Sequence, residues 1–152
     1  MSNSATATKT PTADLLTRLF KNTRMGSESL LALMPKIEDV KLKSDLTLQL
    51  NGYEEFAKKI NHLLSEHGEK SEEESLMTKM SAKIGITMNT MMDASSSHLA
   101  DMVIQGSTMG VTDTLKLVHE FTDSGADPKA LSLAQEIVRF EENNIERLKS
   151  YL

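Results

Sequence analysis

The side chains that could do chemistry in this sequence are carboxylates and four histidines, because its 152 residues include no cysteine. Glu54 and Glu141 lie at the borders of helical apolar patterns, and His98 opens another helical segment. A buried carboxylate must be protonated, paired or bound to a metal, since burying a bare charge is costly. Glu54, His98 and Glu141 are therefore the candidate ligands of a metal site for iron or manganese. In the competing interpretation, the carboxylates lie at the edge of the buried face and reach water or a lysine.

The usual di-iron motif of helical bundles, a glutamate followed three residues later by a histidine, is absent from the sequence. At that spacing Glu54 is followed by Ala57, and Glu141 is followed by Asn144. No pair of histidines has the spacing of a helical metalloprotease site, and no segment resembles a phosphate-binding loop or a serine nucleophile elbow. The sequence therefore predicts a protein that is not an enzyme, with no cofactor expected.

Composition excludes several other classes of protein. The net charge of −5 and the pI of about 5.4 argue against nucleic-acid binding. No segment approaches the ~18 consecutive apolar residues of a membrane span. Residues 1–11 lack the apolar core of a secretory signal, and we interpret them as a disordered tail. We expect a cytoplasmic protein with a single helical-bundle domain over residues 12–152.

Capping residues and helix breakers mark four long helices in the sequence. Asp39 is a suitable N-cap, and Asp127-Pro128 combines an N-cap with a proline in the first helical turn. Gly68 and Gly125 are placed to end the helices before them. The expected helices span residues 12–34, 40–67, 96–123 and 128–151.

The helical pattern of the third helix extends backward almost to Ser71, which would give a rod of roughly 75 Å. Such a rod is about twice as long as the helices that would cover it. Because Ser and Asp cap helices and have poor propensity inside them, we expect a break at residues 93–97. Without that break, the uncovered half of the rod would require a second subunit, and the protein would be an obligate dimer.

Two helix hairpins joined by a long connection form the ferritin-like arrangement of a four-helix bundle. The predicted fold class is all-α, with a short methionine-rich helix in the crossover at residues 69–94. Four stretches resemble a family of small, uncharacterised helical proteins from Gram-positive anaerobes: KNTRMGSESLLALMPKI, SDLTLQLNGYEEFAKK, MVIQGSTMGVTDTLKL and VRFEENNIERLKSYL. That resemblance covers residues 15–152 and implies a fold rather than a reaction.

Four glycines, Gly26, Gly52, Gly106 and Gly110, fall inside expected helices, where each costs about 1 kcal/mol relative to alanine. Close approach of two helices would explain them. The alternative hypothesis is a cavity in the middle of the bundle, beside the Glu141 carboxylate.

Seven of the ten methionines lie between Met77 and Met109. They are interpreted either as core filler or, over residues 77–92, as a docking face for a second subunit or a partner helix. The predicted function is that of a non-enzymatic bundle acting through protein–protein contacts, with self-association as a homodimer. The alternative is a metal-binding or redox protein that uses the carboxylate site.

Overall fold

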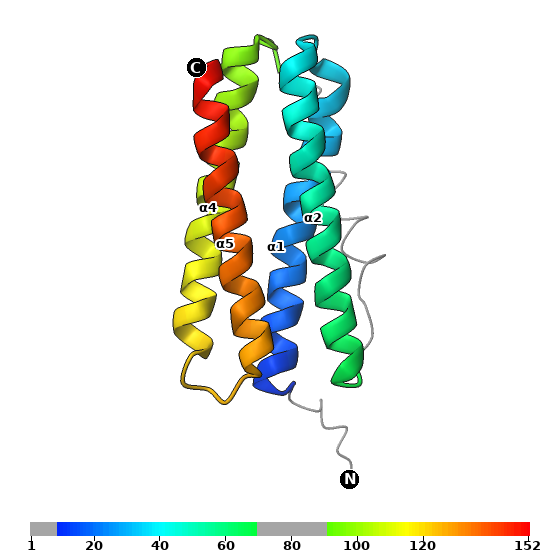
Figure 1. The fold of residues 1–152 in the computed structure, drawn as a ribbon, viewed down its shortest axis with the longest axis vertical. Helices are drawn as coiled ribbons and strands as arrows, with labels where there is room; N and C mark the ends of the chain where they lie inside the picture. The colour runs from blue at the N-terminus through cyan, green and yellow to red at the C-terminus, as the bar shows by residue number, and fades with distance from the viewer. Residues whose placement is uncertain (1–8, 70–90) are drawn as a thin grey trace.

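The computed structural model describes residues 9–69 and 91–152, which form four long helices (Figure 1). They are α1 (Pro11–Leu33), α2 (Val40–Glu66), α4 (Ser96–Phe121) and α5 (Pro128–Leu148), with short 3-10 turns η1 (Met34–Lys36) and η2 (Lys149–Tyr151). The expected helices agree with these bounds to within a few residues, and the described part of the chain contains no strand. Most of the expected crossover helix, and the first eight residues of the expected tail, lie outside the described residues.

Each long helix begins at a side chain that accepts a backbone N–H from the first turn. Asp39 accepts from Leu42 at 2.9 Å, and Ser95 accepts from His98 at 3.3 Å. Thr10 and Asp127 cap α1 and α5 in the same way, each followed by a proline. These caps satisfy N–H groups that have no partner inside the helix, which fixes where each helix starts.

The break expected before the third long helix is confirmed. Residues 91–95 are not helical, and α4 begins at Ser96. The Asp93 carboxylate accepts the backbone N–H of Ser95 at 2.9 Å, which stabilises the turn into the helix. The 26 residues of α4 match the 27 of α2, so the geometric reason for an obligate dimer does not apply.

The four helices form two antiparallel hairpins, α1 with α2 and α4 with α5 (Figure 1). The hairpins pack side by side, so that α1 also contacts α4 and α2 also contacts α5. Helices α2 and α4 run in the same direction, as the long crossover between them requires. This is the predicted all-α topology of hairpin, crossover and hairpin.

A belt of buried polar residues divides the apolar core into two clusters. One cluster is built around Phe20, Ile60 and Phe121, and the other around Leu30, Leu46 and Leu99. The polar belt has members on all four helices: Thr23, Arg24, Ser27, Glu28, Gln49, Ser107, Thr114, Glu141 and Asn144. Buried polar groups destabilise a protein unless they are paired. The middle of the bundle is therefore the candidate location of a functional site.

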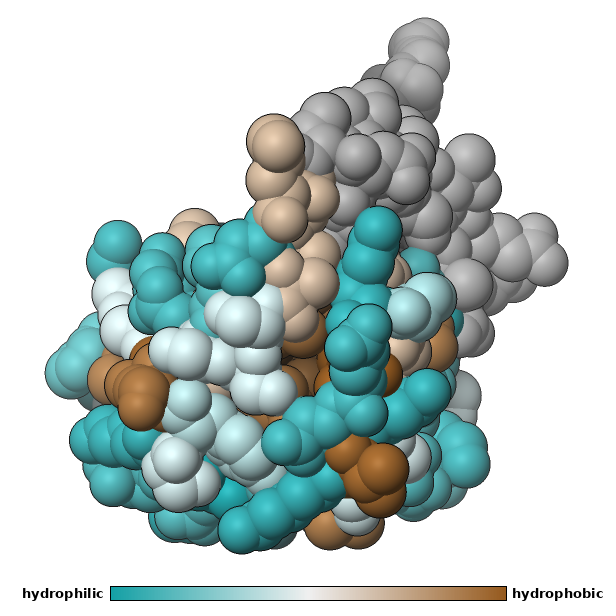
Figure 2. Space-filling model, turned by 90° about the horizontal axis from the view of Figure 1, so that it is seen from above, coloured by the Kyte–Doolittle hydropathy of each residue, from teal (hydrophilic) through white to brown (hydrophobic). Residues whose placement is uncertain are grey.

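The outer surface of the described residues is mixed in character. Seen from the end at which α2 begins, hydrophobic patches lie among hydrophilic side chains (Figure 2). Val40, the first residue of α2, is 83% exposed. None of the described helices is long and apolar enough to cross a bilayer.

Gly52 allows α2 to approach the aromatic cluster of the core. A Cβ atom at this position would overlap the ring of Phe140, which makes edge contacts with Tyr53 and Phe56 at centroid distances of 5.2 Å. Here the glycine is explained by close packing, as one of the two hypotheses for the helical glycines expects.

We predict that Gly52→Ala lowers the free energy of unfolding by about 1–2 kcal/mol, because overpacking outweighs the gain in helix propensity. Urea unfolding measures the change. The matched control is Asn51→Ala, at an exposed neighbouring position, which should change stability little. Stabilisation by Gly52→Ala would contradict the packing at Phe140.

Candidate ligand-binding site

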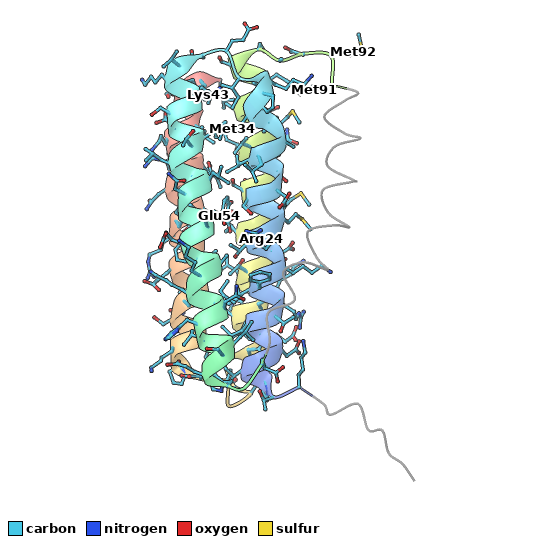
Figure 3. All side chains as sticks on the ribbon, turned by 90° about the vertical axis from the view of Figure 1, so that its right-hand side faces the viewer. Arg24, Met34, Lys43, Glu54, Met91 and Met92 are labelled. Carbon is cyan, nitrogen blue, oxygen red and sulfur yellow. The ribbon has the colours of Figure 1, made fainter. Side chains whose placement is uncertain are left out.

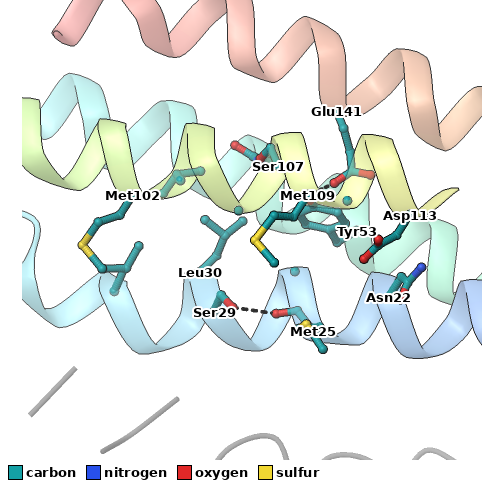
Figure 4. Close-up of a pocket in the computed structure, with 16 residues that line it drawn as sticks. Asn22, Met25, Ser29, Leu30, Tyr53, Met102, Ser107, Met109, Asp113 and Glu141 are labelled. Atoms are coloured by element: carbon teal, nitrogen blue, oxygen red, sulfur yellow. Dashed lines mark hydrogen bonds between the residues drawn. The ribbon is translucent and has the colours of Figure 1, made fainter. Parts of the chain in front are cut away.

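A cavity of about 290 Å³ lies between α1 and α4 in the middle of the bundle. Helices α1 and α4 form its walls. The lining is completed by Gln49 and Tyr53 from α2 and by Glu141 from α5. Figure 4 shows the carboxyl group of Glu141 close to the Tyr53 ring, beside α4. All four helices therefore contribute to one site, although they are far apart in sequence.

Three of the four helical glycines line this cavity: Gly26, Gly106 and Gly110. A Cβ atom at Gly106 would meet nothing within 4 Å. A Cβ atom at Gly26 would be 2.7 Å from Cζ of Tyr53, and one at Gly110 would be 2.9 Å from the carboxyl carbon of Glu141. The hypothesis of a mid-bundle cavity beside Glu141 is thus borne out at Gly106, while Gly26 and Gly110 fit the alternative of close approach, to the Tyr53 ring and to the Glu141 carboxyl group.

The Glu141 carboxyl group is the central polar group of the cavity. Glu141 is only 5% exposed, and the Tyr53 hydroxyl donates a hydrogen bond of 2.8 Å to its Oε2. Burial raises the pKa of Glu141 to about 7, against the lowering effect of the Tyr53 hydrogen bond and with a further contribution from the charge of Asp113. Glu141 therefore changes its charge near neutral pH.

Tyr53 is held as a hydrogen-bond donor by the same surroundings. Burial first, and then the charge of Glu141, raise the pKa of its hydroxyl well above the ordinary value of 10.0. Gln49 and Ser107 act on that hydroxyl in the opposite direction, and Gln49 Nε2 donates to Ser107 Oγ at 3.2 Å. These four side chains form the buried polar floor of the cavity.

Methionines form much of the cavity's outer rim. Met25 is 45% exposed and Met109 is 65% exposed, while Met102 is partly buried (Figure 4). Flexible thioether side chains adapt to apolar partners of different shapes. The expected docking face at residues 77–92 lies almost entirely outside the described residues, and only Met91 and Met92 of it can be placed.

The structure does not bring the three expected metal ligands together. Glu54 pairs with Arg24, whose Nη1 donates to both carboxylate oxygens at 3.1 Å (Figure 3). His98 lies in the first turn of α4. Across residues 9–69 and 91–152, no group of three or more His, Asp or Glu side chains could hold a metal ion. The di-iron centre that a ferritin-like bundle can carry does not fit these residues.

The interpretation that Glu141 lies at the edge of the buried face is wrong. The buried face of α5 includes Ile137, Glu141 and Asn144, so two polar residues occupy core positions. A pattern of apolar residues alone places the centre of this face elsewhere and therefore predicts Glu141 at its border. Glu54 does have a charged partner, but the partner is an arginine rather than a lysine.

We predict that Glu141→Gln makes the protein more stable at neutral and alkaline pH. The pKa of the Glu141 carboxyl group is about 7 in the folded state, against an ordinary value of 4.5 in the unfolded state. The stability contributed by protonation is complete below the ordinary pKa and is lost as the pH rises through 7. Because the glutamine amide does not ionise, the variant keeps this stability. Its free energy of unfolding should exceed that of the unsubstituted protein by about 3 kcal/mol at most, when the pH is well above 7.

Urea unfolding of both proteins across this pH range measures the effect. The difference between the variant and the unsubstituted protein should be small in acid and should grow with pH. The matched control is Glu142→Gln on the exposed side of α5. An equal response to pH in both variants would show that Glu141 does not titrate as a buried group.

Comparisons with known proteins support the fold. No family model matches the chain, and no curated protein matches it. The chain is similar to a solved two-domain protein from Anabaena variabilis that contains DJ-1/ThiJ/PfpI-like and ferritin-like domains, with a TM-score of 0.77 and 19% sequence identity. The match covers 91% of this chain and 38% of that protein.

This similarity shows that the described chain has a ferritin-like fold. It spans well under half of the two-domain protein, and at this level of identity it carries no activity over. The resemblance to a family from Gram-positive anaerobes stays a prediction, because no matching family or curated relative accompanies it.

Proposed function

We propose that the protein is a non-enzymatic bundle that binds a small molecule between α1 and α4. The observation that carries this proposal is the cavity of about 290 Å³, with a buried polar floor and an apolar methionine rim. Ligand sites generally combine apolar walls with a few well-placed polar groups. Since an apolar cavity of about 150 Å³ can hold benzene, this one suits a ligand of roughly ten non-hydrogen atoms.

The polar floor is better suited to binding than to catalysis. Tyr53 donates to Glu141, and Gln49 donates to Ser107, so these groups hold one another in place. Covalent catalysis needs an activated nucleophile, and the pKa of the Tyr53 hydroxyl is raised by burial and by the charge of Glu141, which is the opposite of activation. Preorganised hydrogen-bonding groups instead fix the orientation of a bound molecule.

The other predicted functions have less support from the described residues. Metal binding or redox chemistry with iron or manganese would need ligands beyond the paired Glu54 and the tyrosine-bonded Glu141. Action through protein–protein contacts, as a homodimer or with another partner, stays a prediction. Exposed apolar side chains such as Leu48 and Met92, 57% and 99% exposed, occur singly on most proteins and do not define an interface. Cytoplasmic location is likewise a prediction from the sequence.

We predict that Gly106→Leu fills the cavity without unfolding the protein, because the space beyond Gly106 is open and leucine favours helix. NMR titration with a panel of small aromatic and aliphatic compounds tests the proposal. Backbone shifts should concentrate on the cavity-lining segments of α1 and α4, and Gly106→Leu should abolish them.

The matched control is Thr108→Leu, which adds the same side chain at an exposed position of α4 outside the cavity. This control should bind like the unsubstituted protein. Binding that survives in Gly106→Leu, or a panel in which no compound shifts the lining residues, would overturn the proposed function.

A further inference from the structure

We infer that the cavity selects a primary amine on a small apolar body, with the ammonium group paired to the Glu141 carboxylate. This inference rests on the proposed function and specifies the class of ligand. It follows from the charge, the geometry and the apolar walls of the site.

The charge of the lining favours a cation. Its acidic side chains are Asp113 on α4 and Glu141 on α5, and none of the described residues that line it is lysine, arginine or histidine. Arg24 of α1 does not line the cavity and binds Glu54 instead. Because both charges in the lining are negative, an anionic ligand is repelled and a cationic one is attracted.

The Glu141 carboxylate is only partly satisfied by the protein. Its Oε2 accepts the Tyr53 hydrogen bond, while Oε1 has no hydrogen-bond partner among the described residues. Gly110 packs against both oxygens, since a Cβ atom there would lie 2.9 Å from Oε1 and closer still to Oε2, so a larger residue would leave no room for the carboxyl group. An ammonium group has three donors and no acceptor, which matches an unoccupied carboxylate oxygen.

A bound ammonium group would also stabilise the charged form of Glu141. Without it, the buried carboxylate carries its charge near Asp113 and receives one hydrogen bond. A charge-assisted hydrogen bond in a partly buried site is stronger than one between neutral groups. The methionine rim and the Tyr53 ring would contact the apolar body, and an aromatic face also attracts a nearby cation.

The binding should depend on pH through Glu141. The titratable groups that face it are Tyr53 from α2 and Asp113 from α4, while α1 contributes no titratable side chain to the cavity. As the pH falls through about 7, Glu141 takes up a proton and loses its charge. The affinity for an amine should therefore decrease in acid, and the affinity for a neutral compound should not.

Isothermal titration calorimetry on the full chain tests the inference with three probes of similar shape: 2-phenylethylamine, 2-phenylethanol and phenylacetate. Above neutral pH, the amine should bind about tenfold or more tightly than the alcohol or the acid. Glu141→Gln should remove this preference, and the exposed control Glu142→Gln should keep it. Gly106→Leu should lose binding of the amine while remaining folded.

The outcomes separate this inference from the proposed function. If the alcohol binds as tightly as the amine, or if the preference survives in Glu141→Gln, the inference is overturned while the cavity remains a binding site. If the amine does not bind but neutral compounds of the NMR panel do, the inference again fails alone. If no compound of either set binds in the cavity, both proposals fail.

Discussion

The structure depends on one constraint, the burial of the Glu141 carboxyl group in the middle of a helical bundle. A buried carboxyl group needs a hydrogen-bond partner and enough space between the helices, and the fold supplies both. Tyr53 donates a hydrogen bond to it at 2.8 Å, and Gly110 provides the space that a side chain on α4 would otherwise fill. The absence of a side chain at Gly106 leaves open space in the cavity next to the carboxyl group. Burial makes Glu141 costly to ionise, and the adjoining cavity is what would give a ligand access to it.

The buried charged groups of the polar belt are stabilised in two different ways. On the side of α1 and α2, Arg24 is 5% exposed and forms an ion pair with Glu54, with Glu28 at 3.9 Å. This pairing uses protein groups alone and leaves no carboxylate free for a metal. On the side of α1 and α4, Glu141 has only a neutral hydrogen-bond donor. Ferritin-like bundles can hold metals in the bundle core, and this chain instead has an ion pair on one side of its polar belt and a cavity on the other.

Much of the fold could be predicted from the sequence because helix ends depend on local chemistry. Asp39 and Asp127 cap their helices, and the break before α4 follows from Ser95. The cavity could be anticipated from glycines in helical segments. The depth of Glu141 could not, because periodicity counts apolar residues, and α5 uses Glu141 and Asn144 as core residues. The partner of Glu54 and the rim formed by Met25 and Met109 depend on contacts between distant helices, which no local pattern reveals.

The most direct test is an NMR titration of the Glu141 side chain, following its ¹³C carboxyl resonance in the folded protein, with Glu141→Gln used to assign the signal. A buried carboxyl group bonded to Tyr53 at the cavity should titrate with a pKa of about 7. A pKa near the ordinary 4.5 would place Glu141 in contact with water and contradict the structural basis of the proposed site.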